Sequence, residues 1–265
     1  MRVKWMKNFD ISKMKLGEIK QLAEGLTADA CMSLLTDLKT DERSGVQKYA
    51  LQLESQIRRA TEERERMKRI FSYETEAWSD GFAFVAGLDE AGRGPLVGPV
   101  VAAAVILDPK CDWTGIDDSK KLSAKQRDKF FDKIIAEALF YGVGQASHEE
   151  IDSINILQAT KLAMKRAISA MGIEPDYLLI DAVKLADISI KQTSLIKGDS
   201  KSASIAAASI LAKVTRDRML EELDLAYPQY GFSQHKGYGT KVHYEAIAKY
   251  GIIAEHRRSF LKGIL

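Results

Sequence analysis

The sequence predicts an α/β protein with a mixed β-sheet flanked by helices, preceded by a small helical domain. Three observations support this prediction. Residues 1–80 show helical spacing of apolar side chains and no strand pattern. Residues 82–88 and 100–107 are continuous apolar runs, which are typical of buried strands. Apolar runs and helical patterns then alternate, so we expect a helical extension over 1–80 and an α/β domain over 81–265, with the boundary at residues 79–81.

Three helices are predicted in the N-terminal part. Residues 14–26 have helical spacing, and residues 27–29 then form a cap before a second helix over 31–38. A long helix begins at Ser44 and carries one apolar stripe, while its other faces are charged. We interpret it as an amphipathic helix that packs on its neighbours. The stripe consists of Tyr49, Leu53, Ile57, Ala60, Met67 and Ile70.

The larger part is predicted to contain five strands and four helices. We expect the strands at residues 82–88, 100–107, 140–146, 177–180 and 193–196. The helices are expected at residues 123–139, 155–171, 203–226 and 243–250. The helix over 203–226 contains three consecutive alanines at 206–208, whose small side chains permit close packing.

Composition narrows the class of protein. The 265 residues are 46% hydrophobic and 29% charged, as in a globular protein, and contain no apolar stretch long enough to span a membrane. The positive N-terminus (residues 1–7) is not followed by the apolar region of a signal peptide, so we expect a cytoplasmic protein. Cys31 and Cys111 lack metal or redox spacing and are expected to be reduced thiols. Because no apolar seam lacks an obvious use, we expect a monomer.

Acidic side chains stand at the ends of three predicted strands. Asp89 and Glu90 follow the first strand, Asp181 follows the fourth, and Asp199 follows the fifth. In an open sheet, sites form beyond the strand ends. If the first and fourth strands are neighbours, Asp89 and Asp181 face each other. Glu90 then points to the opposite side of its strand, unless the chain turns at once at Gly92.

These carboxylates predict a metal site. Four carboxylates side by side cannot all remain ionised without cations. Oxygen ligands favour Mg²⁺ or Mn²⁺ over zinc, and two such ions can activate a water and stabilise the leaving oxygen of a phosphodiester. The alternative for each acid is a cap or a turn residue. That alternative is strongest for Asp199, which lies between Gly198 and Ser200.

The glycine-rich segment after the acids has two rival interpretations. Gly92, Arg93, Gly94 and Gly98 superficially match a dinucleotide-binding fingerprint, but prolines and a strand follow where that motif requires a helix. The acidic pair would also repel a pyrophosphate. Residues 198–202 lack the second glycine of a nucleophile elbow. Glycines beside acids instead allow a sugar to approach the backbone, where main-chain groups can meet the 2′-hydroxyl that distinguishes RNA from DNA.

Basic residues gather in two places, although the total net charge is only +2. Residues 233–265 carry a net charge of +4 and residues 197–218 a net charge of +3. Such excesses suit a polyanion, or they are ordinary fluctuations of a solvated surface. Tyr238 lies between two glycines in a predicted loop over 232–240, where it either stacks on a sugar or base or is an ordinary partly buried tyrosine.

Taken together, five segments resemble bacterial ribonuclease HII, the type 2 ribonuclease H family. They follow the family's order over residues 82 to about 260. The segments are residues 89–96 (DEAGRGPL), 118–122 (DSKKL), 178–182 (LLIDA), 197–201 with 206–217, and 235–240 (HKGYGT). The related type 3 enzymes have lysine where Arg93 stands, which favours type 2. The helical residues 1–80 lie outside this resemblance, and their role stays open between gripping the duplex and packing on the catalytic domain.

The resemblance implies a ribonuclease H-like fold and an endonuclease that cleaves the RNA strand of RNA–DNA hybrids and incises at single ribonucleotides in duplex DNA. Its products carry 5′-phosphate and 3′-hydroxyl ends, and its cofactors are Mg²⁺ or Mn²⁺. A non-catalytic nucleic-acid-binding module and a different metal-dependent phosphotransferase are the alternatives. The implied acidic site is Asp89, Glu90, Asp181 and Asp199; the implied nucleic-acid contacts are Gly92, Arg93, Gly94, Tyr238, Lys120 and Lys213.

Overall fold

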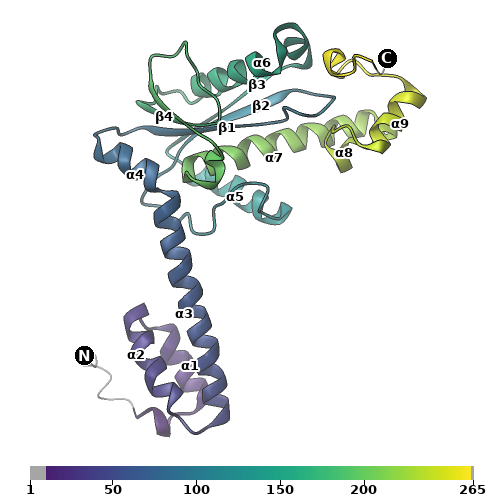
Figure 1. Ribbon diagram of the computed structural model, residues 1–265. Coiled ribbons are helices and arrows are strands. Elements are labelled where there is room, and N and C mark those ends of the chain that lie inside the picture. The colour runs from purple at the N-terminus through teal and green to yellow at the C-terminus, as the bar shows by residue number, and fades with distance from the viewer. Residues whose placement is uncertain (1–9, 264–265) are drawn as a thin grey trace. The chain divides into compact units, whose positions relative to one another are not determined.

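The computed structural model describes residues 10–263, with the side chains of residues 28 and 29 left out. The positively charged segment 1–7 therefore lies outside the described residues. The chain divides into two compact units, Met1–Met67 and Lys68–Leu265. Figure 1 labels the helices and strands. No helix of the described residues is long and apolar enough to cross a membrane.

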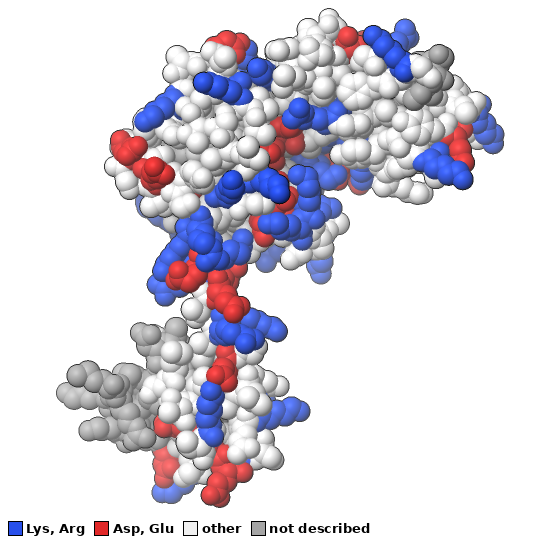
Figure 2. Space-filling model, in the orientation of Figure 1, with Lys and Arg blue, Asp and Glu red and all other residues white. Residues whose placement is uncertain are grey.

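The first unit is helical, as predicted. It contains α1 (Leu16–Glu24), α2 (Ala28–Lys39) and most of α3 (Ser44–Ile70). Its core joins apolar side chains of all three helices, including Ile19, Leu34 and Leu53. Arg43 ties the start of α3 to the preceding chain, because its guanidinium donates to the carbonyls of Met14 and Ile11. Figure 2 shows Lys and Arg side chains interspersed with Asp and Glu side chains along α3.

The second unit is built on a five-stranded mixed sheet in the order β3-β2-β1-β4-β5. β1 pairs antiparallel with β2 and parallel with β4, so the first and fourth strands are neighbours. Pairing is antiparallel between β2 and β3 and parallel between β4 and β5. The strands are β1 (Val85–Ala91), β2 (Val100–Ile106), β3 (Phe140–Ala146), β4 (Tyr177–Asp181) and β5 (Lys191–Leu195).

Helices cover both faces of this sheet (Figure 1). α6 (His148–Ala170) packs on β2 and β3, and α7 (Ala203–Ala226) packs on β1 and β2, with α5 (Ala124–Glu137) against α7. Glycine permits the closest approach: a Cβ on Gly87 would lie 2.1 Å from the backbone of Ser204 in α7. The small residues of α7 and Gly87 thus bring the start of this helix directly against β1, beside the predicted acids.

The helix α4 (Ser72–Ser79) packs within the second unit. Its Glu74 is fully buried and accepts hydrogen bonds from Ser202 Oγ (2.6 Å) and from the main-chain N–H of Ser204 (2.8 Å), at the start of α7. Ala77 joins a small core with Val85 of β1. The contacts of α4 therefore lie with the sheet, while the domain boundary at residues 79–81 stays a prediction.

Several predicted element ends are wrong. β1 begins at Val85 rather than at residue 82, because the N–H groups of Ala83 and Phe84 donate to the carboxylate of Asp176. α6 begins at His148 rather than at Asn155, since Ser147 caps an additional segment. Asn155 has φ 69° and breaks this helix, and its side chain caps the second segment. The predicted loop at 232–240 starts with a short helix, α8 (Phe232–His235).

Candidate active site

Asp89 and Asp181 lie at the ends of two neighbouring parallel strands. The pairing of Leu88 with Ile180 makes Asp89 and Asp181 the next residues on β1 and β4. Asp89 is only 4% exposed. Burial, together with the charges of Glu90 and Asp181, raises the pKa of Asp89 well above its ordinary value. The condition for the predicted approach of these two carboxylates, that the first and fourth strands are neighbours, is confirmed.

Glu90 belongs to β1 rather than following it. One of its carboxylate oxygens lies 3.2 Å from the Arg93 guanidinium, while the other, Oε2, is buried and accepts no hydrogen bond. Burial raises the pKa of Glu90, and Arg93 opposes that shift. Glu90 thus carries a buried oxygen without a hydrogen-bond donor, which a bound cation would satisfy.

Asp199 lies on a short 3₁₀ helix (Gly198–Ser200) between β5 and α7. The N–H of Gly198 donates to Asp181 Oδ1 at 2.6 Å, which joins this turn to the end of β4. Lys120 Nζ lies 3.4 Å from Asp199 Oδ2. Burial and the neighbouring Asp118 raise the pKa of Asp199. Burial lowers the pKa of Lys120, but Asp199 and Asp118 outweigh it, so the net shift is upward.

Two buried serines support this cluster and were missed from the sequence. Ser119 Oγ and Ser209 Oγ lie 2.9 Å apart, which links the segment before α5 to the middle of α7. A hydrogen bond from Ser209 partly opposes the upward shift of the Asp89 pKa. Serine is common on helix surfaces, so nothing in the sequence distinguished Ser209 as a partner of Asp89.

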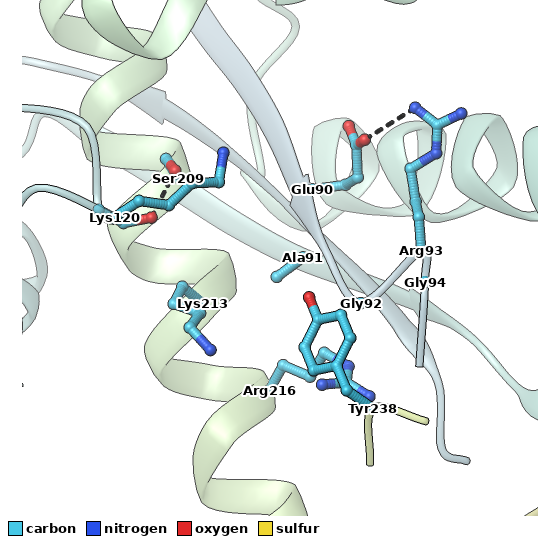
Figure 3. Close-up of a pocket in the computed structure, with 11 residues that line it drawn as sticks. Glu90, Ala91, Gly92, Arg93, Gly94, Lys120, Ser209, Lys213, Arg216 and Tyr238 are labelled. Atoms are coloured by element: carbon cyan, nitrogen blue, oxygen red, sulfur yellow. Dashed lines mark hydrogen bonds and ion pairs between the residues drawn. The ribbon is translucent and has the colours of Figure 1, made fainter. Parts of the chain in front are cut away.

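A pocket of about 390 Å³ adjoins the acids. It brings together seven of the ten predicted residues from four separate segments of the chain. Figure 3 shows Lys120 and Lys213 on one side and the glycine turn on the other, with Tyr238 between them in this view. Asp89, Asp181 and Asp199 do not line the pocket and lie beside it. The predicted residues that line it are Glu90, Gly92, Arg93, Gly94, Lys120, Lys213 and Tyr238.

The glycine turn is held from inside the protein by Arg257. This residue is completely buried, and its guanidinium donates to main-chain carbonyls rather than to carboxylates. The acceptors are the carbonyls of Gly92, Arg93, Pro95 and Gly98, at 2.7–3.1 Å. Burial lowers the pKa of Arg257 to about 9, and the charge of Arg216 adds to this shift. From the sequence, Arg257 and Arg258 counted only toward the positive net charge of residues 233–265, so the role of Arg257 was missed.

Arg216 joins the glycine segment to the Tyr238 loop. It is 1% exposed and donates to the carbonyls of Pro99, Val97 and Lys236 at 3.0–3.1 Å. Gly92 has φ +94°, and a Cβ there would lie 2.0 Å from Arg216 Nε, so only glycine fits. Burial lowers the pKa of Arg216 to about 10. The buried guanidiniums of Arg216, which lines the pocket, and of Arg257, which holds its glycine turn, therefore add positive potential to the pocket.

Lys213 points into the pocket from α7 and is paired with Asp217 at 2.6 Å, one turn further along the helix (Figure 3). Tyr238 is 47% exposed. The pocket thus combines two lysines, a half-exposed aromatic ring and a glycine turn beside four acids. Cations and an aromatic ring at one site suit the phosphates and sugar of a nucleic acid.

The chemistry of the acids fits a divalent metal ion. All four are carboxylates with oxygen donors, which hard cations prefer, and burial is the largest cause that raises the pKa values of Asp89, Glu90 and Asp199. Over residues 10–263, no three His, Cys, Asp or Glu side chains are arranged closely enough to hold a metal as they stand. The acids thus converge at one end of the sheet without enclosing an ion.

The fold and this site define a metal-dependent endonuclease with a ribonuclease H-like fold. Comparison with known proteins gives the family. Residues 86–262 match the family model for ribonuclease HII, and residues 15–78 match the model for the ribonuclease HII N-terminal domain. The chain therefore belongs to the ribonuclease HII family.

Individual relatives agree with this assignment. The ribonuclease HII of Clostridioides difficile is 51% identical over 248 residues, covering 94% of this chain and 97% of the relative. That of Acetivibrio thermocellus is 49% identical, covering 96% of this chain and 100% of the relative. The crystal structure of ribonuclease H2 from Pyrococcus horikoshii superposes with a TM-score of 0.59 at 30% identity, covering 69% of this chain and 97% of the other.

The expected activity is thus confirmed at the level of the family. The protein is a ribonuclease that cleaves RNA in RNA–DNA hybrids and acts in the excision of ribonucleotides from DNA. The alternatives of a non-catalytic binding module and of a different phosphotransferase are set aside.

Proposed function

We propose that Asp89, Glu90, Asp181 and Asp199 are the residues that would hold two Mg²⁺ or Mn²⁺ ions. When bound, such ions activate a water and stabilise the leaving oxygen of a phosphodiester, which yields 5′-phosphate and 3′-hydroxyl ends. The observation that carries this proposal is the buried Glu90 Oε2, which accepts no hydrogen bond.

Lys120 acts as the internal counter-ion of this site. Its ammonium group lies 3.4 Å from Asp199 Oδ2, and its side chain is 78% exposed and so is free to turn toward solvent. With divalent cations bound at the acids, the charge of Lys120 would no longer be required to compensate Asp199. Lys120 then contacts a substrate phosphate, as does Lys213 on the same side of the pocket.

The glycine turn recognises the ribose. Because Arg257 occupies the carbonyls of Gly92 and Arg93, the amide N–H groups of the turn are left to face a 2′-hydroxyl. The ring of Tyr238 stacks on the neighbouring sugar. Recognition of the ribose by Gly92, Arg93 and Gly94 thereby places the scissile phosphate beside Asp89 and Glu90, which couples cleavage to the presence of RNA.

The substrates proposed are an RNA–DNA hybrid and duplex DNA that contains a single ribonucleotide. The protein acts as a monomer in the cytoplasm, as its sequence pattern suggests. Neither the overall net charge of +2 nor the composition argues for a membrane or for an obligate partner.

Metal titration of single variants tests the assignment of the ligands. We expect Asp89→Asn, Glu90→Gln, Asp181→Asn and Asp199→Asn each to weaken binding of Mn²⁺ at least about tenfold by calorimetry. Asp118→Asn is the matched control, because Asp118 lies near Asp199 and its Oδ1 only accepts from the Lys120 N–H. Unchanged Mn²⁺ affinity in the four variants would show that the carboxylates are structural.

A further inference from the structure

Three of the four histidines surround the segment that carries Tyr238. His243 and His256 are almost completely buried, and the rings of His235 and His243 stack with their centroids 4.7 Å apart. They pack on Tyr230 and Phe232, whose rings are stacked and nearly parallel. No catalytic or metal-binding role uses these imidazoles, so their arrangement calls for its own explanation.

The hydrogen bonds determine the tautomer of each buried ring. The N–H of Ile253 donates to His256 Nδ1 at 3.0 Å, so the proton of neutral His256 is on Nε2. That Nε2 lies 3.1 Å from His243 Nε2, which must therefore accept. The proton of His243 is consequently on Nδ1, and it is donated to the carbonyl of Tyr238 at 2.9 Å. One chain of hydrogen bonds thus runs from Ile253 to Tyr238.

His235 supports the peptide on the other side of Tyr238. The N–H of Gly237 donates to His235 Nδ1 at 3.2 Å, so His235 carries its proton on Nε2 and donates it to the carbonyl of Tyr230 at 2.8 Å. Imidazoles therefore hold the N–H of Gly237, which precedes Tyr238, and the main-chain carbonyl of Tyr238 itself. This arrangement requires neutral rings, and burial lowers the pKa of His243 and lowers that of His256 to about 4.

The consequence lies on the pocket side of the loop. Lys236 has φ 48°, a left-handed conformation that a residue with a Cβ adopts only when its surroundings support it, and Gly237 follows with φ +81°, which glycine adopts freely. The ring of Tyr238 is 47% exposed and touches the pocket, whereas its main-chain carbonyl points inward to His243. The buried histidines can thus fix the orientation of the Tyr238 ring through their contacts with the backbone.

We propose that His243, backed by His256, is a positioning residue that holds the Tyr238 ring in the orientation in which it stacks on the substrate sugar. This inference rests on the proposed stacking role of Tyr238. His243 has no contact with substrate in this arrangement and acts only through the Tyr238 carbonyl. Its effect on cleavage must therefore disappear when the tyrosine ring is absent.

A double-mutant cycle on cleavage of duplex DNA with a single ribonucleotide tests the proposal. His243→Leu removes both ring nitrogens and should lower kcat/KM about tenfold, mainly through KM. His243→Asn keeps an N–H near the position of Nδ1 and should recover to within about threefold of wild type. In the Tyr238→Ala background, His243→Leu should change kcat/KM less than about twofold. His148→Leu, which alters the fourth histidine, is the matched control.

The outcomes separate the inference from the proposed role of Tyr238. If Tyr238→Ala lowers kcat/KM and His243→Leu lowers it equally in both backgrounds, the positioning role is overturned and the stacking role stands. If Tyr238→Ala has no effect, the stacking role falls and the inference falls with it. Where His243→Leu does not fold, nitrogen-15 NMR of the wild-type rings decides: we expect His243 protonated on Nδ1 and His256 on Nε2, and the opposite tautomer of His243 would overturn the proposal.

Discussion

The ring of Tyr238 lies against Gly94: a Cβ placed on Gly94 would be 3.5 Å from Tyr238 Cε1. The two residues belong to loops that are far apart in the sequence but are joined in space. The N–H of Leu96 donates to the carbonyl of Gly237, and Arg216 donates to carbonyls of both loops. The proposed ribose sensor and the proposed stacking residue therefore form one rigid pocket, and substitutions at its glycines should separate folding from recognition.

Gly92→Ala should lower stability, whereas Gly94→Ala should leave stability unchanged and affect substrate binding. At Gly92 the backbone has φ +94° and a Cβ would collide with Arg216, so alanine should lower the free energy of unfolding by about 2–4 kcal/mol. At Gly94 a Cβ makes ordinary contact, so stability should change by less than about 0.5 kcal/mol, while the narrower space beside Tyr238 should raise KM. Urea unfolding and steady-state kinetics measure the two effects. Equal losses of stability in both variants would contradict this account of the turn.

Asp89→Asn should stabilise the metal-free protein while it abolishes cleavage. The buried carboxylate of Asp89 is repelled by Glu90 and Asp181, and asparagine removes that repulsion with little change of shape. We expect the free energy of unfolding in EDTA at pH 7 to rise by about 1–2 kcal/mol.

The same variant predicts a dependence on pH. Since the pKa of Asp89 is raised on folding, the folded state binds more protons than the unfolded state, and the free energy of unfolding falls as pH rises through the folded pKa. Asn lacks this dependence. The stability advantage of Asp89→Asn should thus be largest at neutral pH and should disappear as the pH falls below the unfolded pKa of about 3.9, where the wild-type carboxyl is protonated in both states. An advantage that grows on acidification would contradict the assignment.

Glu74 should be needed as a hydrogen-bond acceptor rather than as a charge. Glu74→Ala leaves the Ser202 hydroxyl and the Ser204 N–H without their acceptor and should cost about 1–3 kcal/mol for each unsatisfied group. Because burial raises the pKa of Glu74, the neutral Glu74→Gln should keep stability near the wild-type value. Denaturant unfolding of the two variants decides, and equal destabilisation by both would refute this reading of the contact.

Removal of residues 1–67 tests whether the helical unit grips the duplex. The truncation ends before α4 because Glu74 and Ala77 pack in the second unit, which should remain folded. The first unit exposes several bases, including Lys20, Lys48 and Arg59. If they contact phosphates, Kd for a hybrid should rise by roughly tenfold, more at low salt, with little change in kcat. Unchanged affinity and turnover would leave the unit without a role in binding.

The sequence could predict the sheet and the location of the acids, because apolar runs and charged residues at their ends are local signals. The residues at which helices and strands begin and end were harder to predict. The apolar run from Phe82 does not reveal that Asp176 holds the N–H groups of Ala83 and Phe84, which delays the start of β1. The helix start at Ser147 is different, because Ser147 and Glu150 form a capping box, a local sequence signal that the helical spacing after Asn155 concealed.

The buried supports of the site could not be predicted. Arginine is a residue type usually found at the surface. Only the folded chain shows that carbonyls of loops distant in sequence accept hydrogen bonds from Arg257 and Arg216. The same holds for His243 and His256, which in sequence were only part of a basic stretch. A site residue at a strand end has a local signature, whereas a residue that holds a loop from behind does not.

In the proposed mechanism, residues 89–94 combine metal-dependent cleavage with recognition of a ribose. The most direct measurement is single-turnover cleavage, with binding measured in parallel, of one duplex containing a single ribonucleotide and of the same duplex made entirely of DNA. We predict metal-dependent cleavage only at the ribonucleotide, no cleavage but nearly intact binding for Asp89→Asn, and for Arg93→Ala a loss of discrimination larger than the loss of stability. Near-normal turnover by Asp89→Asn, or an equal loss on all substrates for Arg93→Ala, would contradict it.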